Sequence, residues 1–377
     1  MLKTIEFIRE TYKTKREIPL HAPLFEGNEL NYVTDAINST FVSSVGRYVN
    51  LFEDSILKFT KTKSAVAVMN GTAALSVGLR VVGVRPGDEV ITQSLTFVAT
   101  GNAILYNQAS PVFLDVDYET MGLSSRAVLN FLKEFGERRE DGSYNRLSGR
   151  RIAACVPMHT FGFPTDIIQL SNVCSEWKIP IVEDAAESLG STVNGIHTGT
   201  FGKCGVFSFN GNKIITGGSG GVLISDDVQI GKLAKHLTTT AKVDHPYEYY
   251  HDQLGFNYRL PNLNAALLCA QMEQLERFLL EKRNRAKAYS DFFQNNSAFK
   301  FREEQPNTQA NYWLNCIEAN NLEERNLFIE FALKNGISVR PIWNLLWKLP
   351  HFQGCFRDNQ ENSIFLEERI INIPSSV

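Results

Sequence analysis

The sequence has little of what a disulfide-bonded, membrane-spanning or nucleic-acid-binding protein needs. Its six cysteines are scattered among 377 residues without a CxxC pair, which favours a reducing compartment over a disulfide framework or a metal site. No apolar run approaches the ~18 residues of a membrane span, and the N-terminus lacks the apolar core of a secretory signal. The formal net charge of −3 argues against a nucleic-acid partner. We therefore expect a cytoplasmic protein without a membrane partner, a nucleic-acid partner or a bound metal.

Apolar residues make up 43% of the chain, which is enough for a large core. From Ser64 onward short apolar runs alternate with segments of helical period, which predicts an α/β fold with a mostly parallel sheet. The expected strands are 65–69, 89–92, 111–114, 151–156 and 337–340. The expected helices are 2–12, 28–39, 49–59, 72–82, 98–107, 124–136, 165–177, 261–292 and 322–334. The polar residues 137–150 are expected to form an exposed loop.

The segment 181–221 carries polar residues at the ends of apolar runs. Asp184 follows the run 179–182, and Lys213 follows the run 205–209. In open α/β sheets, ligands bind at such strand ends. A lysine that is partly desolvated can condense with a carbonyl, and a carboxylate can keep a pyridine nitrogen protonated, so this pair suits pyridoxal phosphate. A solvated loop lysine and a helix-capping aspartate remain the alternative reading.

A candidate phosphate site lies between a predicted strand and a predicted helix. Gly71 lets the backbone approach a ligand closely, and the first N–H groups of the helix are free to bind an anion. The hydroxyls of Thr72 and Ser208 can add donors to the same phosphate. Phe97 can stack on a flat ring, although a core position is the alternative. The other glycines have neither GxGxxG nor Walker-type spacing.

Seven motifs follow one another in the order and spacing of a known family. They are SSVGRYVNLFE at 43–53, NGTAAL at 70–75, SLTFVAT at 94–100, VEDAAESLGS at 182–191, FSFNGNK at 207–213, TGGSGG at 216–221 and GFNYRL at 255–260. Together they resemble the sugar-nucleotide aminotransferases of the DegT/DnrJ/EryC1/StrS family, and the likeness runs from Ile18 to the end of the chain. The resemblance implies pyridoxal 5'-phosphate as the cofactor and the type I aminotransferase fold.

That fold has a large domain with a mostly parallel seven-stranded sheet and a smaller α+β domain. For this chain it implies an N-terminal helix and segment at 1–48 that joins the small domain. It further implies a large cofactor-binding domain at 49–260, and a long linking helix with the small domain at 261–377. Members usually continue past the segment 373–376 into a final helix, so we expect a trimmed chain or a small domain that lacks this element.

The resemblance also implies residue roles. Lys213 bonds the cofactor, and Asp184 is the partner of its ring nitrogen. Contacts to the cofactor phosphate, ring or ring hydroxyl are implied for Gly71, Thr72, Ser208, Phe97 and Glu187. At the position of Glu187, many members carry Gln or His. Asn257 and Arg259 reach into the neighbouring subunit's site, which implies a homodimer with shared active sites.

The likeness is strongest to the subgroup that aminates UDP-4-keto-6-deoxy-N-acetylglucosamine on the way to legionaminic acid or bacillosamine-type sugars. The N-terminal helix and the segments GRRIAACVPMH at 149–159 and ISVRPIW at 337–343 carry it. We therefore expect glutamate as the amino donor and a UDP-linked sugar as the acceptor. Loop or strand-end placement nominates Ser43, Ser44, Tyr312, Trp313 and Arg340 for the sugar nucleotide.

Other readings stay open. A GDP- or dTDP-linked keto sugar of the perosamine type would use the same chemistry. A dehydrating relative carries histidine at the lysine position, and a non-catalytic regulator on this fold does not need Lys213, Asp184 and Thr72 together. Trp313 can pack at the domain boundary, and His159 is interpreted as a structural histidine.

Overall fold

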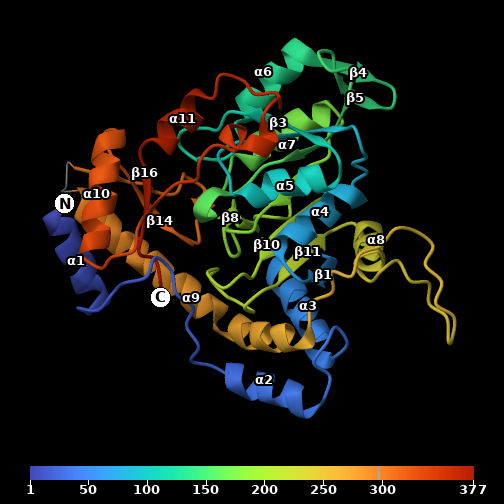
Figure 1. The fold of residues 1–377 in the computed structure, drawn as a ribbon, viewed down its shortest axis with the longest axis horizontal. Helices are drawn as coiled ribbons and strands as arrows, with labels where there is room; N and C mark the ends of the chain where they lie inside the picture. Colours follow the sequence, from blue (N-terminus) through green and yellow to red (C-terminus); the bar gives the residue numbers. More distant parts are fainter. Residues whose placement is uncertain (295–297) are drawn as a thin grey trace.

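A seven-stranded sheet lies at the centre of this computed structural model, which describes residues 1–294 and 298–377 (Figure 1). One run of strands orders β1 (Ser64–Val68), β11 (Gly221–Ser225), β10 (Cys204–Ser208) and β7 (Val182–Asp184), and another orders β3 (Ser110–Leu114), β2 (Glu89–Gln93) and β6 (Arg151–Val156). Parallel bridges from Cys155 to Ile181 and from Met158 to Asp184 join β6 to β7. Among these seven strands, only the pairs that involve β11 are antiparallel, so the predicted α/β fold is confirmed.

The described residues form eleven α-helices, and the nine that were expected lie within one or two residues of their expected positions. The helices are α1 (Leu2–Tyr12), α2 (Glu29–Asn38), α3 (Arg47–Thr60), α4 (Gly71–Val81), α5 (Val98–Tyr106), α6 (Ser125–Phe135), α7 (Ile167–Glu176), α8 (Val228–Thr238), α9 (Asn262–Gln294), α10 (Leu322–Lys334) and α11 (Glu361–Glu367). Helices α8 and α11 were not expected. Several helices begin at a residue whose side chain accepts a backbone N–H of the first turn, namely Asn70, Ser124, Asp166, Asp227 and Asn321.

Both faces of the sheet are buried, because neighbouring residues on one strand pack into different clusters. Val206 and Leu223 pack with α4, whereas Phe207 and Val222 pack with residues of α3 and α9. This alternation explains why the strands read as continuous apolar runs in the sequence. It also leaves the strand ends as the part of the sheet where polar groups can meet a ligand.

The C-terminal part of the chain forms a smaller antiparallel sheet. Its order is β12 (Lys300–Phe301), β14 (Asn315–Glu318), β16 (Ile370–Ile373) and β15 (Arg340–Pro341). A second small sheet contains β13 (Thr308–Gln309), β8 (Thr192–Val193) and β9 (Ile196–His197). Helix α9 packs against α2, α3 and β12 and so links the two parts, as Figure 1 shows. Short 3-10 turns are η1 (Thr160–Gly162), η2 (Leu346–Lys348) and η3 (Pro350–Phe352).

Two sequence-based expectations were wrong. The predicted loop 137–150 contains a hairpin of β4 (Gly136–Arg139) and β5 (Gly142–Asn145) that pairs with the start of β6. Its buried residues are polar, with Ser143 donating to the carbonyl of Trp177 and Asn145 to Glu89, so hydropathy gave no strand signal. The strand expected at 337–340 is reduced to β15, because Ile337 pairs only through one bridge with Ile18.

The chain ends lie beside the C-terminal sheet rather than in solvent-exposed arms (Figure 1). Helix α1 packs Ile5 and Ile8 into the main core, and Ser375 donates its N–H to the carbonyl of Leu20 at 2.8 Å. Within residues 1–294 and 298–377, no helix combines the length and apolar character that crossing a membrane requires.

Candidate active site

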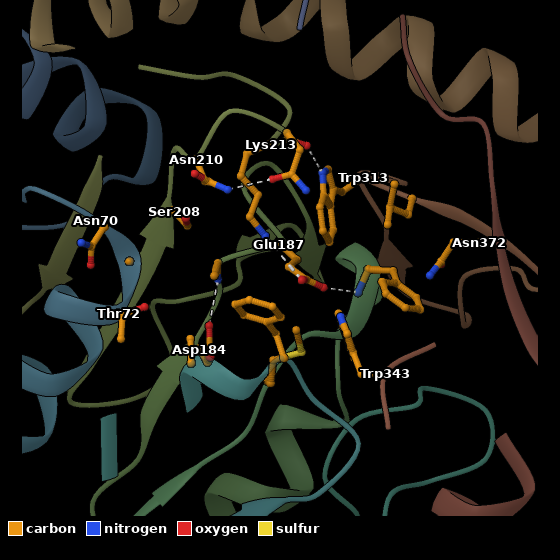
Figure 2. A pocket seen from close by; sticks show the side chains of 18 of the residues that line it. Asn70, Thr72, Asp184, Glu187, Ser208, Asn210, Lys213, Trp313, Trp343 and Asn372 are labelled. Atoms are coloured by element: carbon orange, nitrogen blue, oxygen red, sulfur yellow. Dashed lines mark hydrogen bonds and ion pairs between the residues drawn. The ribbon is translucent and has the colours of Figure 1, made fainter. Parts of the chain in front are cut away.

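A cavity of about 450 Å³ opens where the C-terminal ends of β7 and β10 meet the start of α4 (Figure 2). Residues of β15 and β16 complete it from the other side. The cavity therefore lies between the large sheet and the C-terminal sheet. It brings together nine of the residues predicted from the sequence, which are Gly71, Thr72, Phe97, Asp184, Glu187, Ser208, Lys213, Trp313 and Arg340.

Lys213 reaches into the cavity from the turn that follows β10. Its backbone N–H donates to the carbonyl of Asn210, and its Nζ donates to Oε1 of Glu187 at 3.4 Å. The same Nζ lies 3.8 Å from the ring centroid of Trp313, and the Lys213 side chain is only 13% exposed. The amine is therefore held between a carboxylate and an indole face with little water around it. The reading of Lys213 as a solvated loop lysine is wrong.

Asp184 ends β7 and is buried at the floor of the cavity. Its Oδ2 accepts the hydroxyl of Thr100 at 2.7 Å, and its Oδ1 accepts the N–H of Ala186 at 3.2 Å. Burial raises the pKa of this carboxyl above its ordinary value, and the hydrogen bonds from Thr100 and Ala186 and the charge of Lys213 oppose that rise. A carboxylate fixed in this way can face a protonated ring nitrogen.

Glu187 is buried between Lys213 and the backbone of η1. Burial raises the pKa of its carboxyl to about 7, against the opposing charge of Lys213 and the hydrogen bond from the Phe161 N–H. That bond joins the Phe161 nitrogen to Oε2 at 2.9 Å. At neutral pH this carboxyl can both hold and release a proton beside the lysine amine.

The start of α4 forms a cradle for an anion. The side chain of Asn70 accepts the N–H of Ala73 at 2.8 Å, which fixes the first turn of the helix. A Cβ built on Gly71 would lie 2.9 Å from Cβ of Ser208, so only glycine leaves the strand and the helix this close. Thr72 and Ser208, whose hydroxyls can donate to an anion, line the cavity beside the first turn of the helix, where backbone N–H groups have no partner within the helix.

Phe97 lies at the start of α5 and lines the cavity with 51% of its surface exposed. It is therefore not a core aromatic, and one face is available to a flat ligand. The ring nearest to it across the cavity is that of Trp343, with centroids 6.5 Å apart. An anion cradle, an aromatic face, an amine and a buried carboxylate in one cavity fit pyridoxal phosphate.

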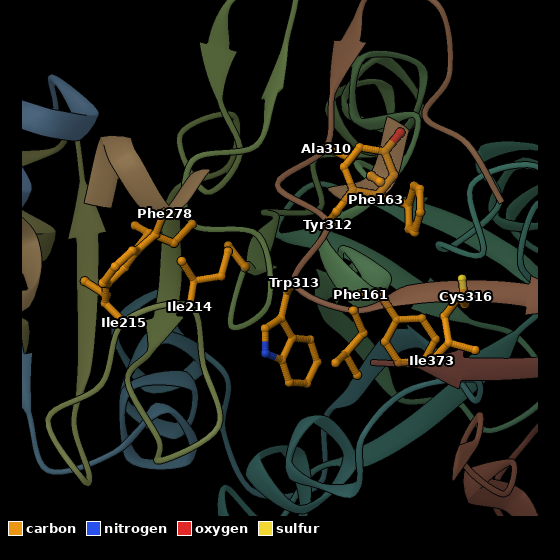
Figure 3. Packing of buried hydrophobic residues seen from close by; sticks show 14 of the residues in the cluster. Phe161, Phe163, Ile214, Ile215, Phe278, Ala310, Tyr312, Trp313, Cys316 and Ile373 are labelled. Atoms are coloured by element: carbon orange, nitrogen blue, oxygen red, sulfur yellow. The ribbon is translucent and has the colours of Figure 1, made fainter. Parts of the chain in front are cut away.

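Several predicted site residues lie elsewhere. Asn257 and Arg259 hydrogen-bond to each other at 3.0 Å and, like Ser43 and Ser44, do not line this chain's cavity. Tyr312 points away from Trp313 and stacks edge-on against Phe163, as Figure 3 shows, with ring centroids 5.4 Å apart. Their predicted contacts with cofactor or substrate stay predictions.

His159 is fully satisfied away from the cavity. Its Nε2 lies 3.0 Å from Oε2 of Glu183, and its Nδ1 accepts the N–H of Thr165. Glu183 also accepts the backbone N–H groups of Gly199, Phe201 and Gly202. The pair holds the loop after β9 against β7, which agrees with the interpretation of a structural histidine.

Sequence reasoning missed Thr100, Trp343 and Asn372. Thr100 lies one helical turn after Phe97 in the motif at 94–100, so the i, i+3 spacing could have revealed it. Trp343 lies in the segment 337–343, whose likeness to the UDP-sugar subgroup gives this residue no role of its own. Asn372 had no signal, because its position on a short strand beside Arg340 depends on the tertiary pairing.

Comparisons with known proteins agree with this geometry. Residues 23–377 match the DegT/DnrJ/EryC1/StrS aminotransferase family. The GDP-perosamine synthase of Vibrio cholerae is 34% identical over 364 residues, 95% of this chain and 94% of the relative. The GDP-perosamine synthase of Escherichia coli O157:H7 is 32% identical over 360 residues, 95% of this chain and 93% of the relative.

Among solved structures, Helicobacter pylori PseC, an aminotransferase involved in the biosynthesis of pseudaminic acid, has the same fold. Its TM-score is 0.86 at 21% identity, with 95% of this chain and 94% of that chain covered. The enzymes of the matched family use pyridoxal 5'-phosphate, which the cavity fits. The chain therefore belongs to the DegT/DnrJ/EryC1/StrS family and is a pyridoxal-phosphate-dependent aminotransferase of sugar nucleotides.

Proposed function

We propose that the enzyme moves the amino group of glutamate to C4 of a UDP-linked 4-keto-6-deoxy-N-acetylhexosamine. The product would be a UDP-4-amino-4,6-dideoxy sugar for a glycan of the legionaminic acid or bacillosamine type, made in the cytoplasm. The observation that carries the aminotransfer chemistry is the position of Lys213. Its Nζ lies between Glu187 and Trp313 in the same cavity as the buried carboxylate of Asp184.

Each predicted cofactor-site residue in this cavity has a role in the proposed reaction. When bound, pyridoxal phosphate supplies a carbonyl for the amine and a ring that withdraws electrons. Lys213 bonds the cofactor and carries protons, while Glu187 takes up or returns a proton at Nζ. Asp184 keeps the ring nitrogen protonated. The α4 N–H groups and the nearby hydroxyls hold the phosphate, and Phe97 covers one face of the ring.

The choice of sugar rests on the likeness to the UDP-sugar subgroup, which the N-terminal helix and the segments 149–159 and 337–343 carry together. Three residues of the segment 337–343, Arg340, Pro341 and Trp343, line the cavity and so can contact a substrate. Trp313 adds a second aromatic face. Ser43 and Ser44 lie outside this cavity, so a contact from them would have to reach the cavity of a second copy.

A second candidate is a GDP-linked 4-keto-6-deoxy sugar. The specific observation in its favour is the match to two GDP-perosamine synthases over 95% of this chain. The two candidates differ in the base and in the N-acetyl group, and both use the same amino-transfer chemistry.

A panel of UDP-, GDP- and dTDP-linked 4-keto sugars, each offered with glutamate, separates the candidates. We expect the UDP-linked N-acetyl sugar to give the highest kcat/KM. Faster turnover of the GDP sugar would move the enzyme to the second candidate. Replacing glutamate by glutamine, alanine or aspartate in the same assay tests the donor.

We also propose a homodimer with shared active sites. The support is that Asn257 and Arg259 carry a family motif and yet lie outside the cavity of their own chain. Mixing Lys213→Ala chains with Asn257→Ala/Arg259→Ala chains should restore about a quarter of the wild-type rate, because half of the dimers are hybrid and each has one whole site. No recovery after verified subunit exchange would mean that each site is built from one chain.

A further inference from the structure

Two polar residues on adjacent strands face the cavity from the side opposite the large sheet. Arg340 of β15 and Asn372 of β16 are direct partners in the antiparallel register, and both line the cavity. Side chains of directly opposed residues project on the same face of a sheet with Cβ atoms about 5 Å apart. Figure 2 shows the Asn372 side chain pointing from its strand toward the cavity. The two side chains therefore form one continuous polar surface.

Neither side chain is bonded to the protein. Within residues 1–294 and 298–377, Arg340 makes no side-chain hydrogen bond or ion pair, whereas Arg302 and Arg283 pair with acids. The residue Asn372 is only 4% exposed, and its buried Oδ1 has no hydrogen-bond partner there; its NH₂ group likewise makes no hydrogen bond to these residues. An oxyanion can accept from the NH₂ group of Asn372, which is the part of the amide that can bind such a ligand, whereas Oδ1 only accepts.

We propose that Arg340 and Asn372 form a single oxyanion-binding subsite, which takes a carboxylate of the amino donor or a phosphate of the sugar nucleotide. The subsite rests on the proposed function only for the identity of these two anions. The guanidinium offers a planar fork of N–H donors that matches two oxygens of a carboxylate or phosphate. The amide NH₂ of Asn372 adds a donor to the same group from the neighbouring strand.

The nature of the pair favours an oxyanion over a sugar ring. Both acids that line the cavity, Asp184 and Glu187, are held by the protein on the side of Lys213. The charge of Arg340 is therefore complementary to a negative group of a substrate, and both substrates of an aminotransferase of this family carry one. A permanent acid partner would neutralise Arg340, and none is present among the described residues. Substrates that alternate in one cavity need a surface whose donors are free between turnovers.

Two half-reactions separate the two sources of the anion. Each is followed in a single turnover through the cofactor absorbance, once with glutamate and once with the UDP-linked keto sugar. The variants are Arg340→Gln, Arg340→Lys, Asn372→Leu and the Arg340→Gln/Asn372→Leu double. Arg126→Gln is the matched control, because Arg126 on α6 is exposed and lies outside the cavity.

We expect Arg340→Gln to weaken the apparent affinity for one substrate by roughly tenfold or more, since it removes a charge-assisted pair. Arg340→Lys should restore part of that loss because it keeps the charge without the fork. Asn372→Leu should weaken the same substrate, and the double variant should lose less than the product of the two single losses, because both residues hold one group. Loss with glutamate identifies the carboxylate, and loss with the sugar identifies the phosphate.

Chemical modification of Arg340 in the cofactor-free protein tests the subsite independently of enzyme turnover. In the apoprotein, an arginine-specific dicarbonyl reagent should modify Arg340, and glutarate or pyrophosphate should slow that modification, as read by peptide mass spectrometry. Neutral glutaramide should not protect. If the sugar panel rejects UDP sugars but protection persists, the subsite stands and the proposed substrate falls. Affinities equal to those of the control together with no protection overturn the subsite, as does a loss at Arg340 and Asn372 for different substrates.

Discussion

The cavity has two walls that differ in what their polar groups are bonded to. The lysine wall, formed by Asp184, Glu187 and Lys213, holds every one of these side chains through protein contacts. The strand wall is formed by Arg340 and Asn372, and neither side chain has a hydrogen-bond or ion-pair partner in the part of the chain that the structure describes. The two walls line the same cavity, but Arg340 is exposed whereas Asp184 and Glu187 are buried.

The difference teaches how a site can serve one permanent ligand and two exchanging ones. On the lysine wall, fixed partners set the position and the proton affinity of groups that act on the cofactor in every cycle. On the strand wall, donors without partners leave a polar surface free for groups that arrive and depart. Leaving a buried amide unsatisfied costs about 1–3 kcal/mol, so such a surface is retained at the expense of stability.

The largest expected effect tests the lysine wall directly. Lys213→Ala should abolish transamination while leaving the fold intact, because no other side chain offers an amine at that position. Loss of proton transfer alone is worth ~10²–10⁴-fold. Turnover with glutamate and thermal unfolding are the measurements, with exposed Lys203→Ala as the matched control. Steady turnover by Lys213→Ala without an added amine would remove the lysine from this role.

The next effect concerns the floor of the same wall. Asp184→Asn should still bind the cofactor but should lower kcat at least about 30-fold, because loss of one member of a buried charge pair costs about 2–5 kcal/mol. An amide cannot keep a ring nitrogen protonated. Cofactor absorbance and single-turnover rates measure the two properties separately. Exposed Asp226→Asn is the control, and near-normal turnover of Asp184→Asn would contradict the assignment.

Glu187 sharpens the comparison because its proton can be followed without any ligand. In the folded apoprotein the pKa of its carboxyl is raised from 4.5 to about 7, mainly by burial. The folded state therefore binds this proton more tightly than the unfolded state. The resulting stabilisation is fully present below pH ~4.5 and is lost as the pH rises through ~7. The whole contribution is about 3 kcal/mol at most.

Urea unfolding of the wild type and of Glu187→Gln across this pH range measures the contribution of Glu187 to the free energy of unfolding. The difference in the free energy of unfolding, wild type minus variant, should fall as pH rises from about 4.5 to about 7 and then stay level. Subtracting the variant cancels the titration of the other groups. A difference that is independent of pH would show that Glu187 titrates as it does in the unfolded chain.

The lysine wall could be predicted from the sequence, and the strand wall largely could not. Asp184, Ser208 and Lys213 lie at the ends of apolar runs that form adjacent parallel strands, so strand order alone brings them together. Asn372 joins Arg340 only through pairing between two short antiparallel strands, and neither strand has a hydropathy pattern that fixes its register.

The positions of some other residues also depend on tertiary packing, and the sequence alone could not predict them. Tyr312 and Trp313 are neighbours in sequence, yet Tyr312 lies among Phe163 and Phe301 while Trp313 faces Lys213. Loop position suggested the same role for both. The hairpin at 136–145 could not be predicted from hydropathy, because its buried side chains are hydrogen-bonded polar groups rather than apolar ones.

The smallest expected effect concerns Trp313, which borders the lysine wall from the C-terminal part of the chain. Its ring lies over Nζ of Lys213, and its Nε1 donates to the carbonyl of Asn212 at 2.7 Å, so it contacts both the amine and the turn that carries it. Trp313→Phe keeps an aromatic face and loses only the hydrogen bond, whereas Trp313→Leu loses both. A cation–π contact at a partly desolvated site is worth about 0.5–2 kcal/mol, so Trp313→Leu should slow the glutamate half-reaction roughly two- to thirtyfold and Trp313→Phe less. Trp347→Phe, outside the cavity, is the control. Equal rates for Trp313→Leu and the wild type would mean that Trp313 only packs between the two parts of the fold, and Glu187 alone would then position the amine.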